Sequence, residues 1–230
     1  MKEHNEEQSR KQLAYDEAIK GKTDEEVVAL NYFFNAAKKK GCFKKKQVLL
    51  VSDAQYDELV AKRAGELTEQ AVFAALGLDG NQSWFNESLK VHTPEFENAE
   101  YVKMGADETA RTSRITTTVL LYGADTMYFY SRTFSLTDRY NNELAASIMY
   151  KDITSIALNT VTTETRRDVI EQSGCLKKNK EIQVWVPATS NKVIFTVPGK
   201  TYTVNVGNAK SIMTATIAKL RTKIAECKKK

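Results

Sequence analysis

The chain has few of the residues on which most catalytic and metal sites depend. It contains only two histidines, His4 and His92, far apart in sequence. A Ser–His–Asp triad would rest on His92 alone, and two histidines so placed indicate no metal site. The strings GxGxxG, GxxxxGK[ST], HExxH and GxSxG are all missing. The sequence therefore predicts no catalytic residue, no metal and no cofactor; an enzyme with an unrecognised site is kept as the third hypothesis.

Cysteine and long apolar runs are equally scarce. Cys42, Cys175 and Cys227 are widely spaced and form no CxxC pair, which excludes a zinc knuckle and a complete set of intrachain disulfides. Lysines next to Cys42 and Cys175 favour the thiolate, but no base is near either residue in sequence. No window has the roughly 18 apolar residues that a spanning helix needs. The polar N-terminus lacks the apolar core of a signal peptide, so we expect a soluble, cytoplasmic protein.

The net charge of +5 hides an uneven distribution. Residues 1–100 hold 14 Lys+Arg and 18 Asp+Glu, a balance of −4, whereas residues 101–230 hold 20 and 11, a balance of +9. The two halves could attract each other, or the basic half could face an anionic partner, or both could be ordinary solvated surfaces. The densest basic run, Lys38–Lys46, suits the last turn of a helix ended by Gly41 better than a phosphate site.

The first hundred residues have the pattern of a helical portion. Thr23 with Glu26 and Ser52 with Gln55 are capping boxes, and each precedes an apolar stripe at helical spacing. Gly77 ends a helical stretch over 66–77. Residues 78–100 are predicted to be a connection with a short helix near 82–89. This N-terminal portion, residues 1–100, resembles no family.

From about residue 101 the apolar residues recur with a period of two. This pattern predicts seven strands, separated by turns and by a loop over 163–180, at residues 114–122, 126–136, 143–150, 153–160, 181–187, 192–198 and 200–206. Asn208 then caps a helix whose Ile217, Leu220 and Ile224 share one side. We therefore predict an α+β protein in which residues 101–230 form a seven-stranded antiparallel barrel closed by a C-terminal amphipathic helix.

Seven strands followed by one helix is the order of the pleckstrin-homology (PH) superfold. The segment ASIMYKDITSIAL, Ala146–Leu158, resembles a stretch in bacterial PH-like and GRAM-type domains. There, an aromatic residue, a polar pair and an aliphatic residue mark the passage from the third strand into the fourth. Tyr150, Lys151, Asp152 and Ile153 match that pattern, and the likeness covers roughly residues 101–227.

The resemblance implies a domain that binds lipid headgroups, peptides or proteins and performs no chemistry. Lipid-binding members use basic residues on the first two strands and the loop between them. In this chain that loop would be residues 123–125, short and acidic, so the resemblance does not support phosphoinositide binding. Lys151 and Lys200 lie in turns that the topology places at one end of the barrel. They are candidate ligands for an anion, although solvated turn lysines are the simpler interpretation.

Several predicted strands carry large apolar groups on both faces. Tyr128 and Tyr130 alternate with Met127 and Phe129, and Trp185 alternates with valines. A barrel needs only one apolar face, so the outer groups must be covered by the N-terminal helices, by a second copy of the chain or by a partner. Covering within the chain is the simplest expectation. The residues that would form an outer interaction surface are Trp185, Ile194, Tyr128 and Tyr130.

Three functional hypotheses follow. The leading one is a non-catalytic module that binds a protein or peptide, either through the outer surface near Trp185 or by adding a strand to an exposed edge. The second is attachment to anionic lipid through the basic C-terminal half, with nucleic acid as the less favoured anionic partner. The third is the enzyme with an unrecognised site. Self-association of the chain stays open.

Overall fold

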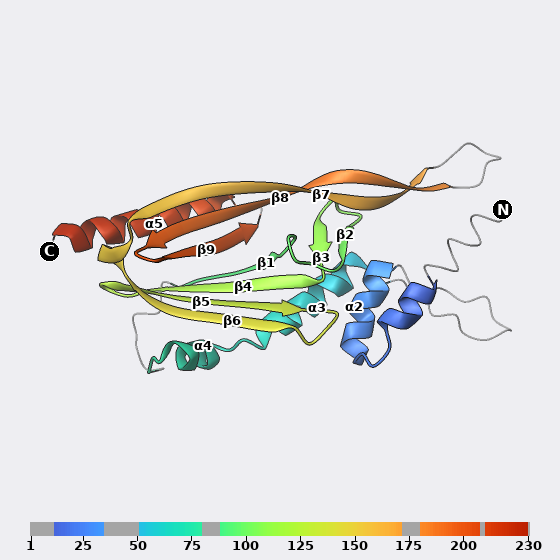
Figure 1. Cartoon of the computed structure of the whole chain (residues 1–230), viewed down its shortest axis with the longest axis horizontal. Helices are drawn as coiled ribbons and strands as arrows, with labels where there is room; N and C mark the ends of the chain where they lie inside the picture. Colours follow the sequence, from blue (N-terminus) through green and yellow to red (C-terminus); the bar gives the residue numbers. More distant parts are fainter. Residues whose placement is uncertain (1–11, 35–50, 80–87, 172–179, 208–209, 230) are drawn as a thin grey trace.

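The computed structural model describes residues 12–34, 51–79, 88–171, 180–207 and 210–229 (Figure 1). Helices and antiparallel strands are both present, which confirms the α+β class. The prediction of one closed seven-stranded barrel was wrong, because the described residues form nine strands in three separate sheets. The additional strands come from segments whose short or polar sequences were interpreted as connections.

Sheet A has the strand order β1-β4-β5-β6, and all neighbours are antiparallel. Its strands are β1 (Leu89–Pro94), β4 (Arg114–Tyr122), β5 (Thr126–Ser135) and β6 (Asn141–Met149). β1 alternates buried Val91 and Thr93 with exposed Lys90 and His92. Six residues are too few for a firm period of two, which explains why this segment was predicted to be a connection. Residues 82–87 of the expected short helix lie outside the described part of the chain, and sheet A begins before residue 101.

Sheet C has the order β7-β8-β9, formed by β7 (Ser155–Glu171), β8 (Lys180–Val197) and β9 (Lys200–Gly207). Two predictions were wrong here. The stretch 181–197 is a single strand without a turn at 188–191, and the expected loop over 163–180 is strand as far as residue 171. β7 and β8 pair from Val161↔Ser190 to Glu171↔Lys180, so the backbone groups of the polar residues in this stretch are bonded even where the apolar pattern is weak. Figure 1 shows this two-stranded ribbon extending past β9.

A hairpin, a helical stretch over residues 12–18 and three further helices complete the first half of the fold. β2 (Val102–Met104) and β3 (Ala110–Thr112) form sheet B, and the helices are α2 (Asp24–Phe34), α3 (Asp53–Gly65) and α4 (Glu69–Leu76). Both capping boxes are confirmed by their reciprocal hydrogen bonds. Residues 66–77 do not simply continue the preceding helix, because the Thr68 hydroxyl accepts from the Ala71 N–H and starts α4. Gly77 ends α4 with φ 67°, as predicted.

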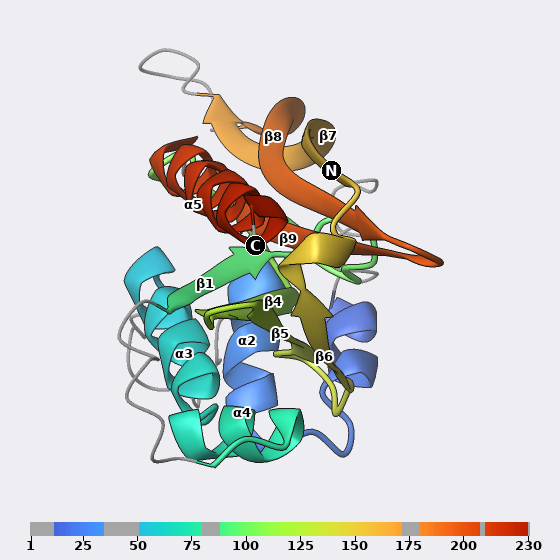
Figure 2. The same cartoon turned by 90° about the vertical axis from the view of Figure 1, so that its left-hand side faces the viewer.

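The three helices cover the outer face of sheet A. Figure 2 shows α2, α3 and α4 on one side of this sheet and sheet C with α5 (Lys210–Lys229) on the other. Ile115 and Phe134 of the sheet pack against α2 and α3, whereas Val119 and Tyr130 pack against α4. Covering of the outer face within the chain is therefore confirmed for sheet A.

The main core lies between sheet A, sheet C and α5. Phe129 of sheet A, Phe195 of sheet C and Leu220 of α5 are all buried in it. The Phe129 and Phe195 ring centroids are 6.0 Å apart. α5 packs against β8, β9 and the short 3-10 helix η2 (Tyr150–Asp152), and its buried Ile217 and Leu220 confirm the predicted apolar side.

An arginine that the sequence analysis overlooked joins the β2–β3 hairpin to α3. The side chain of Arg111, on β3, is only 5% exposed. It donates to both Asp57 carboxylate oxygens, at 2.8 and 2.7 Å, and to both Asp107 oxygens, at 2.8 and 2.9 Å. Asp53 accepts from the Ala106 N–H at 2.8 Å and from the Tyr32 hydroxyl at 2.8 Å. Asp57 of α3 is thus half of an ion pair that connects two elements.

The ion pair predicts a pH-dependent contribution to stability. Hydrogen bonds from Arg111 hold the pKa of Asp107 well below its usual value. A carboxyl whose folded pKa is depressed stabilises the fold fully above its unfolded pKa, about 4, and loses that contribution as the pH falls further. We expect Asp107→Asn to lower the urea midpoint at pH 7 and to have a smaller effect near pH 2.5, where part of the contribution is already lost. An unchanged difference at both pH values would contradict this role of the charge.

Candidate binding site

β6 and β7 are consecutive in the chain but belong to different sheets. Each is an edge strand, β6 of sheet A and β7 of sheet C. The corner between them is η2, where the Tyr150 N–H donates to Asp125 O at 3.0 Å and the Thr154 N–H to Thr196 O at 2.8 Å. Figure 1 shows the two strands separating as they leave this corner.

The inner face of β6 becomes progressively exposed away from the corner. Ile148, Ala146 and Leu144 lie opposite Met127, Phe129 and Ser131 of β5, so all three are on the face that carries the main core. Ile148 is buried, Ala146 is partly buried and Leu144 is 38% exposed. The core is therefore covered near η2 and uncovered farther along the strand.

The exposure of inner-face residues also increases along β7, in the facing sheet C. Ile156 and Leu158 lie opposite Phe195 and Val193, two fully buried core residues, and thus share the inner face of sheet C. Ile156 is partly buried, yet Leu158 is 55% exposed. Two leucines directed to the inner faces of facing sheets are consequently exposed to solvent. We call the set Leu144, Ala146, Ile156 and Leu158 the β6–β7 opening.

The first half of β7 has none of the residue types that usually protect an edge strand from pairing. Residues 155–163 (SIALNTVTT) contain no charged residue, no proline and no glycine. β6 has a single charge, Glu143, whose Oε1 is 3.8 Å from Arg132 Nε. Natural edge strands are commonly protected by lysines, prolines or bulges, because an unprotected edge pairs readily with another chain. The first half of β7 is thus suited to accept an additional strand.

A buried hydroxyl lies on the same inner face. Thr118 of β4 is opposite Ser131 of β5, which is opposite Leu144 of β6, so the three form a row that leads to the opening. Thr118 Oγ1 is buried and has no hydrogen-bond partner among the described residues. A buried unpaired hydroxyl costs about 1–3 kcal/mol. This side of the interior therefore carries an unfavourable contribution to stability that the apolar core next to it does not.

The four residues predicted to form an interaction surface do not come together. Tyr130 is buried and Tyr128 partly buried beneath α4. Ile194 is partly exposed in sheet C, and Trp185, 58% exposed, lies in the ribbon nine residues away along β8, a separation of roughly 30 Å at 3.3 Å per residue. The exposed apolar residues that face each other, Leu144 and Leu158, were overlooked because the sequence does not show which sheet edges are adjacent.

The two candidate lysines lie in η2 and at the start of β9. Lys151 is in η2, and Lys200 follows the β8–β9 turn, next to the Thr196 that bonds Thr154. Both lysines are exposed, and Lys200 Nζ is 4.9 Å from the ring centroid of Tyr202. Anion binding by this pair stays a prediction.

The loop that the resemblance pointed to, residues 123–125, joins β4 to β5. In sheet A, β1 precedes β4, and residues 95–113 connect these two strands. The basic residues of that connection are Lys103 and Arg111. Lys103 Nζ donates to Tyr32 O at 2.7 Å, and Arg111 binds aspartates. Both cations are thus used to attach the hairpin to the helices.

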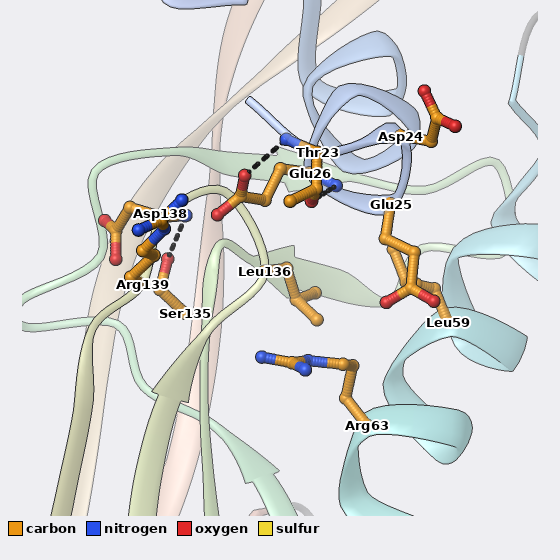
Figure 3. Close-up of a pocket in the computed structure, with 10 residues that line it drawn as sticks. All are labelled: Thr23, Asp24, Glu25, Glu26, Leu59, Arg63, Ser135, Leu136, Asp138 and Arg139. Carbon is orange, nitrogen blue, oxygen red and sulfur yellow. Dashed lines mark hydrogen bonds between the residues drawn. The ribbon is translucent and has the colours of Figure 1, made fainter. Parts of the chain in front are cut away.

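A separate cleft of about 540 Å³ lies between the start of α2, α3 and the β5–β6 turn (Figure 3). Its charged residues largely bind within the chain. Glu26 accepts from the Thr23 N–H at 2.7 Å, Glu25 pairs with Lys62, and Arg63 bonds Glu66 at 3.1 Å. Figure 3 shows Arg63 directed toward Leu136. Glu25, Glu26 and Arg63 of this cleft are thus already bound to other residues of the chain.

The remaining sequence candidates add no second site. His92 Nδ1 lies 2.8 Å from Thr117 Oγ1, and burial lowers the pKa of the imidazole. Lys38–Lys46 (with Cys42), Cys175 and His4 lie outside the described residues. Over the described ranges, no group of three His, Cys, Asp or Glu residues is placed to hold a metal ion, and no helix is long and apolar enough to cross a membrane.

Comparisons with known proteins identify no relative. No family model matches the chain, and searches of curated proteins and of solved structures return no match.

Proposed function

We propose that this protein is a non-catalytic interaction module that binds an extended segment of a protein partner as an additional strand on β7. The observation that carries the proposal is the first half of β7, an uncharged edge whose inner-face Leu158 is 55% exposed. An added strand would bond the outward N–H and C=O groups of this edge, which supply affinity whatever the partner's sequence.

Specificity would come from the β6–β7 opening. Alternate residues of an extended segment point to the same face, so every second side chain of a strand on β7 would enter the opening beside Leu158 and Leu144. Apolar side chains would fit there, since the burial of the exposed half of Leu158 alone is worth about 1 kcal/mol. The partner segment is therefore expected to alternate apolar residues with polar ones and to carry few charges.

The order of elements supports the same proposal. Four strands of sheet A, apart from the inserted β2–β3 hairpin, are followed by three strands of sheet C and by α5. This is the order that the resemblance to PH-like domains implies. Strand addition is one of the modes by which domains without catalytic activity recognise peptides.

Selection from a random peptide library displayed on phage would test the proposed function. We expect enriched peptides with alternating apolar residues, whose binding is lost with Leu158→Lys because the charge points into the opening. Met149→Lys is the matched control, because Met149 is 50% exposed but lies on the opposite face of β6 from Leu144. Failure to enrich any peptide, or binding that is insensitive to Leu158→Lys, would reject the function.

A further inference from the structure

The uncharged segment of β7 is complementary to itself. In an antiparallel pair each residue of one strand lies opposite a residue of the other, and like charges placed opposite each other are destabilising. Residues 155–163 contain no charge, so two copies of this segment meet without repulsion. The flanking Asp152 and Glu164 mark where this neutral segment ends.

We infer that the strand added to β7 is β7 of a second copy, so that the chain forms a symmetric dimer with a continuous six-stranded sheet. This inference rests on the proposed function, because it uses the same edge and names its occupant. The order of strands across the dimer would be β9-β8-β7 from one copy and β7-β8-β9 from the other. Such a pairing is isologous, in which one surface serves both subunits.

The position of Leu158 selects the register. A twofold axis at Leu158 pairs Ser155 with Val161 and Ile156 with Thr160 of the second copy, and it places the two Leu158 side chains side by side. The paired stretch ends at Ser155 and Val161, because Asp152, which this register sets across from Glu164 of the second copy, belongs to η2 and not to β7. Directly opposite Cβ atoms in such pairs are about 4.5–5.5 Å apart. Each Leu158 would then cover the exposed surface of the other, which removes from water the most exposed apolar side chain of the opening.

The other sheet edges are less suited to this role. β1, the second edge of sheet A, lies against β9, the second edge of sheet C, and Asn205 Nδ2 donates across this contact to Pro94 O at 3.2 Å. β6 carries Glu143 within its exposed half. β7 is itself in contact with β2, but Ser155 and residues 157–160 are exposed and uncharged, so the first half of β7 combines exposure with the absence of charge.

Cysteine cross-linking tests the register directly. Leu158→Cys is placed in a chain whose three native cysteines, Cys42, Cys175 and Cys227, are replaced by Ser, and the purified protein is oxidised mildly. We expect a disulfide-linked dimer, because cross-strand Cα atoms about 4.5–5.5 Å apart lie within disulfide range. Leu144→Cys in the same background is the control, and it should cross-link far more slowly because it lies on β6.

Sedimentation equilibrium of the unmodified chain provides the second measurement. We expect a dimer whose dissociation constant rises at least about a hundredfold with Leu158→Lys, since two ammonium groups would meet at the twofold axis. Met149→Lys should leave the dimer unchanged. A circular dichroism spectrum like that of the unmodified chain ensures that the Leu158→Lys variant is folded.

The outcomes separate this inference from the proposed function. A chain that sediments as a monomer, with no cross-link at Leu158, would overturn the inference while library peptides could still bind the same edge. A dimer that survives Leu158→Lys would overturn it as well, because the interface must then lie elsewhere. If the chain is monomeric and no peptide is enriched, both the inference and the proposed function fail.

Discussion

Replacing Arg111 by methionine should lower the free energy of unfolding by about 3 kcal/mol. Loss of one partner from a buried ion pair typically costs about 3–5 kcal/mol, and the lower value is expected here because Asp57 and Asp107 are about half exposed. Methionine preserves most of the apolar stem, so the effect reports the lost charge and hydrogen bonds rather than an empty space. The substitution also leaves Asp53, Asp57 and Asp107 facing one another without a cation.

Urea unfolding followed by circular dichroism would measure this effect. Arg114→Met, three residues away, is the matched control. Arg114 stands over the Tyr140 ring, with the guanidinium carbon 4.1 Å from the centroid, and both residues are partly exposed. Its loss should cost less than about 1 kcal/mol. Similar costs for the two arginines would show that the aspartates do not hold Arg111 in the way that the distances indicate.

Gly105→Ala should be destabilising by at least about 2 kcal/mol, because the added methyl group has no room. A Cβ at this position would clash with Arg111 Nη1 and lie 2.6 Å from Asp107 Oδ1 and 2.8 Å from Asp53 Oδ2. The clash is with the same cluster that fastens the hairpin to α3. Relief of the clash requires the Arg111 side chain to move, which breaks its paired hydrogen bonds.

The control for this substitution is Gly65→Ala. Nothing lies within 4 Å of a Cβ at Gly65, so this change should be close to neutral in the same unfolding measurement. The double variant Gly105→Ala with Arg111→Met provides a second check. Its cost should be clearly less than the sum of the two single costs, since both changes disrupt one cluster. Additive costs would mean that the two residues act independently.

The helix boundaries were predictable because they depend on neighbours in sequence. Ser52 and Gln55 form their two hydrogen bonds within one turn, and Gly77 takes the left-handed conformation that ends α4. The buried side of α5 followed from the spacing of Ile217 and Leu220 in the same way. Each of these features involves groups no more than a few residues apart, so the local sequence contains the whole interaction.

The errors in the strands have a different cause. β8 includes residues 188–191, Ala-Thr-Ser-Asn, whose composition is typical of a turn. They are strand because residues 160–163 of β7 lie opposite and bond their backbone groups. A polar strand of this kind is recognised from its partner rather than from its own residues. The ribbon and the single long β8 therefore could not be inferred from periodicity.

The candidate site was only partly accessible to sequence reasoning. Apolar residues on both faces of several strands did indicate that something must cover the second face, and the N-terminal helices do so for Tyr130. The same pattern gave no weight to Leu144 or Leu158, which look like ordinary core residues. They are exposed because β6 and β7 are edge strands that separate beyond η2.

The amino-acid sequence by itself determined the α+β class, the helix caps and the face of α5 that is buried, since these depend on propensity, spacing and hydrogen bonds within a turn. Only the tertiary structure decided which strands pair, which edges remain uncovered, and that Arg111 meets Asp57, 54 positions away in the chain. Those outcomes depend on contacts between segments that are distant in sequence. The residues adjacent to a position in the chain do not indicate which distant residue it will contact.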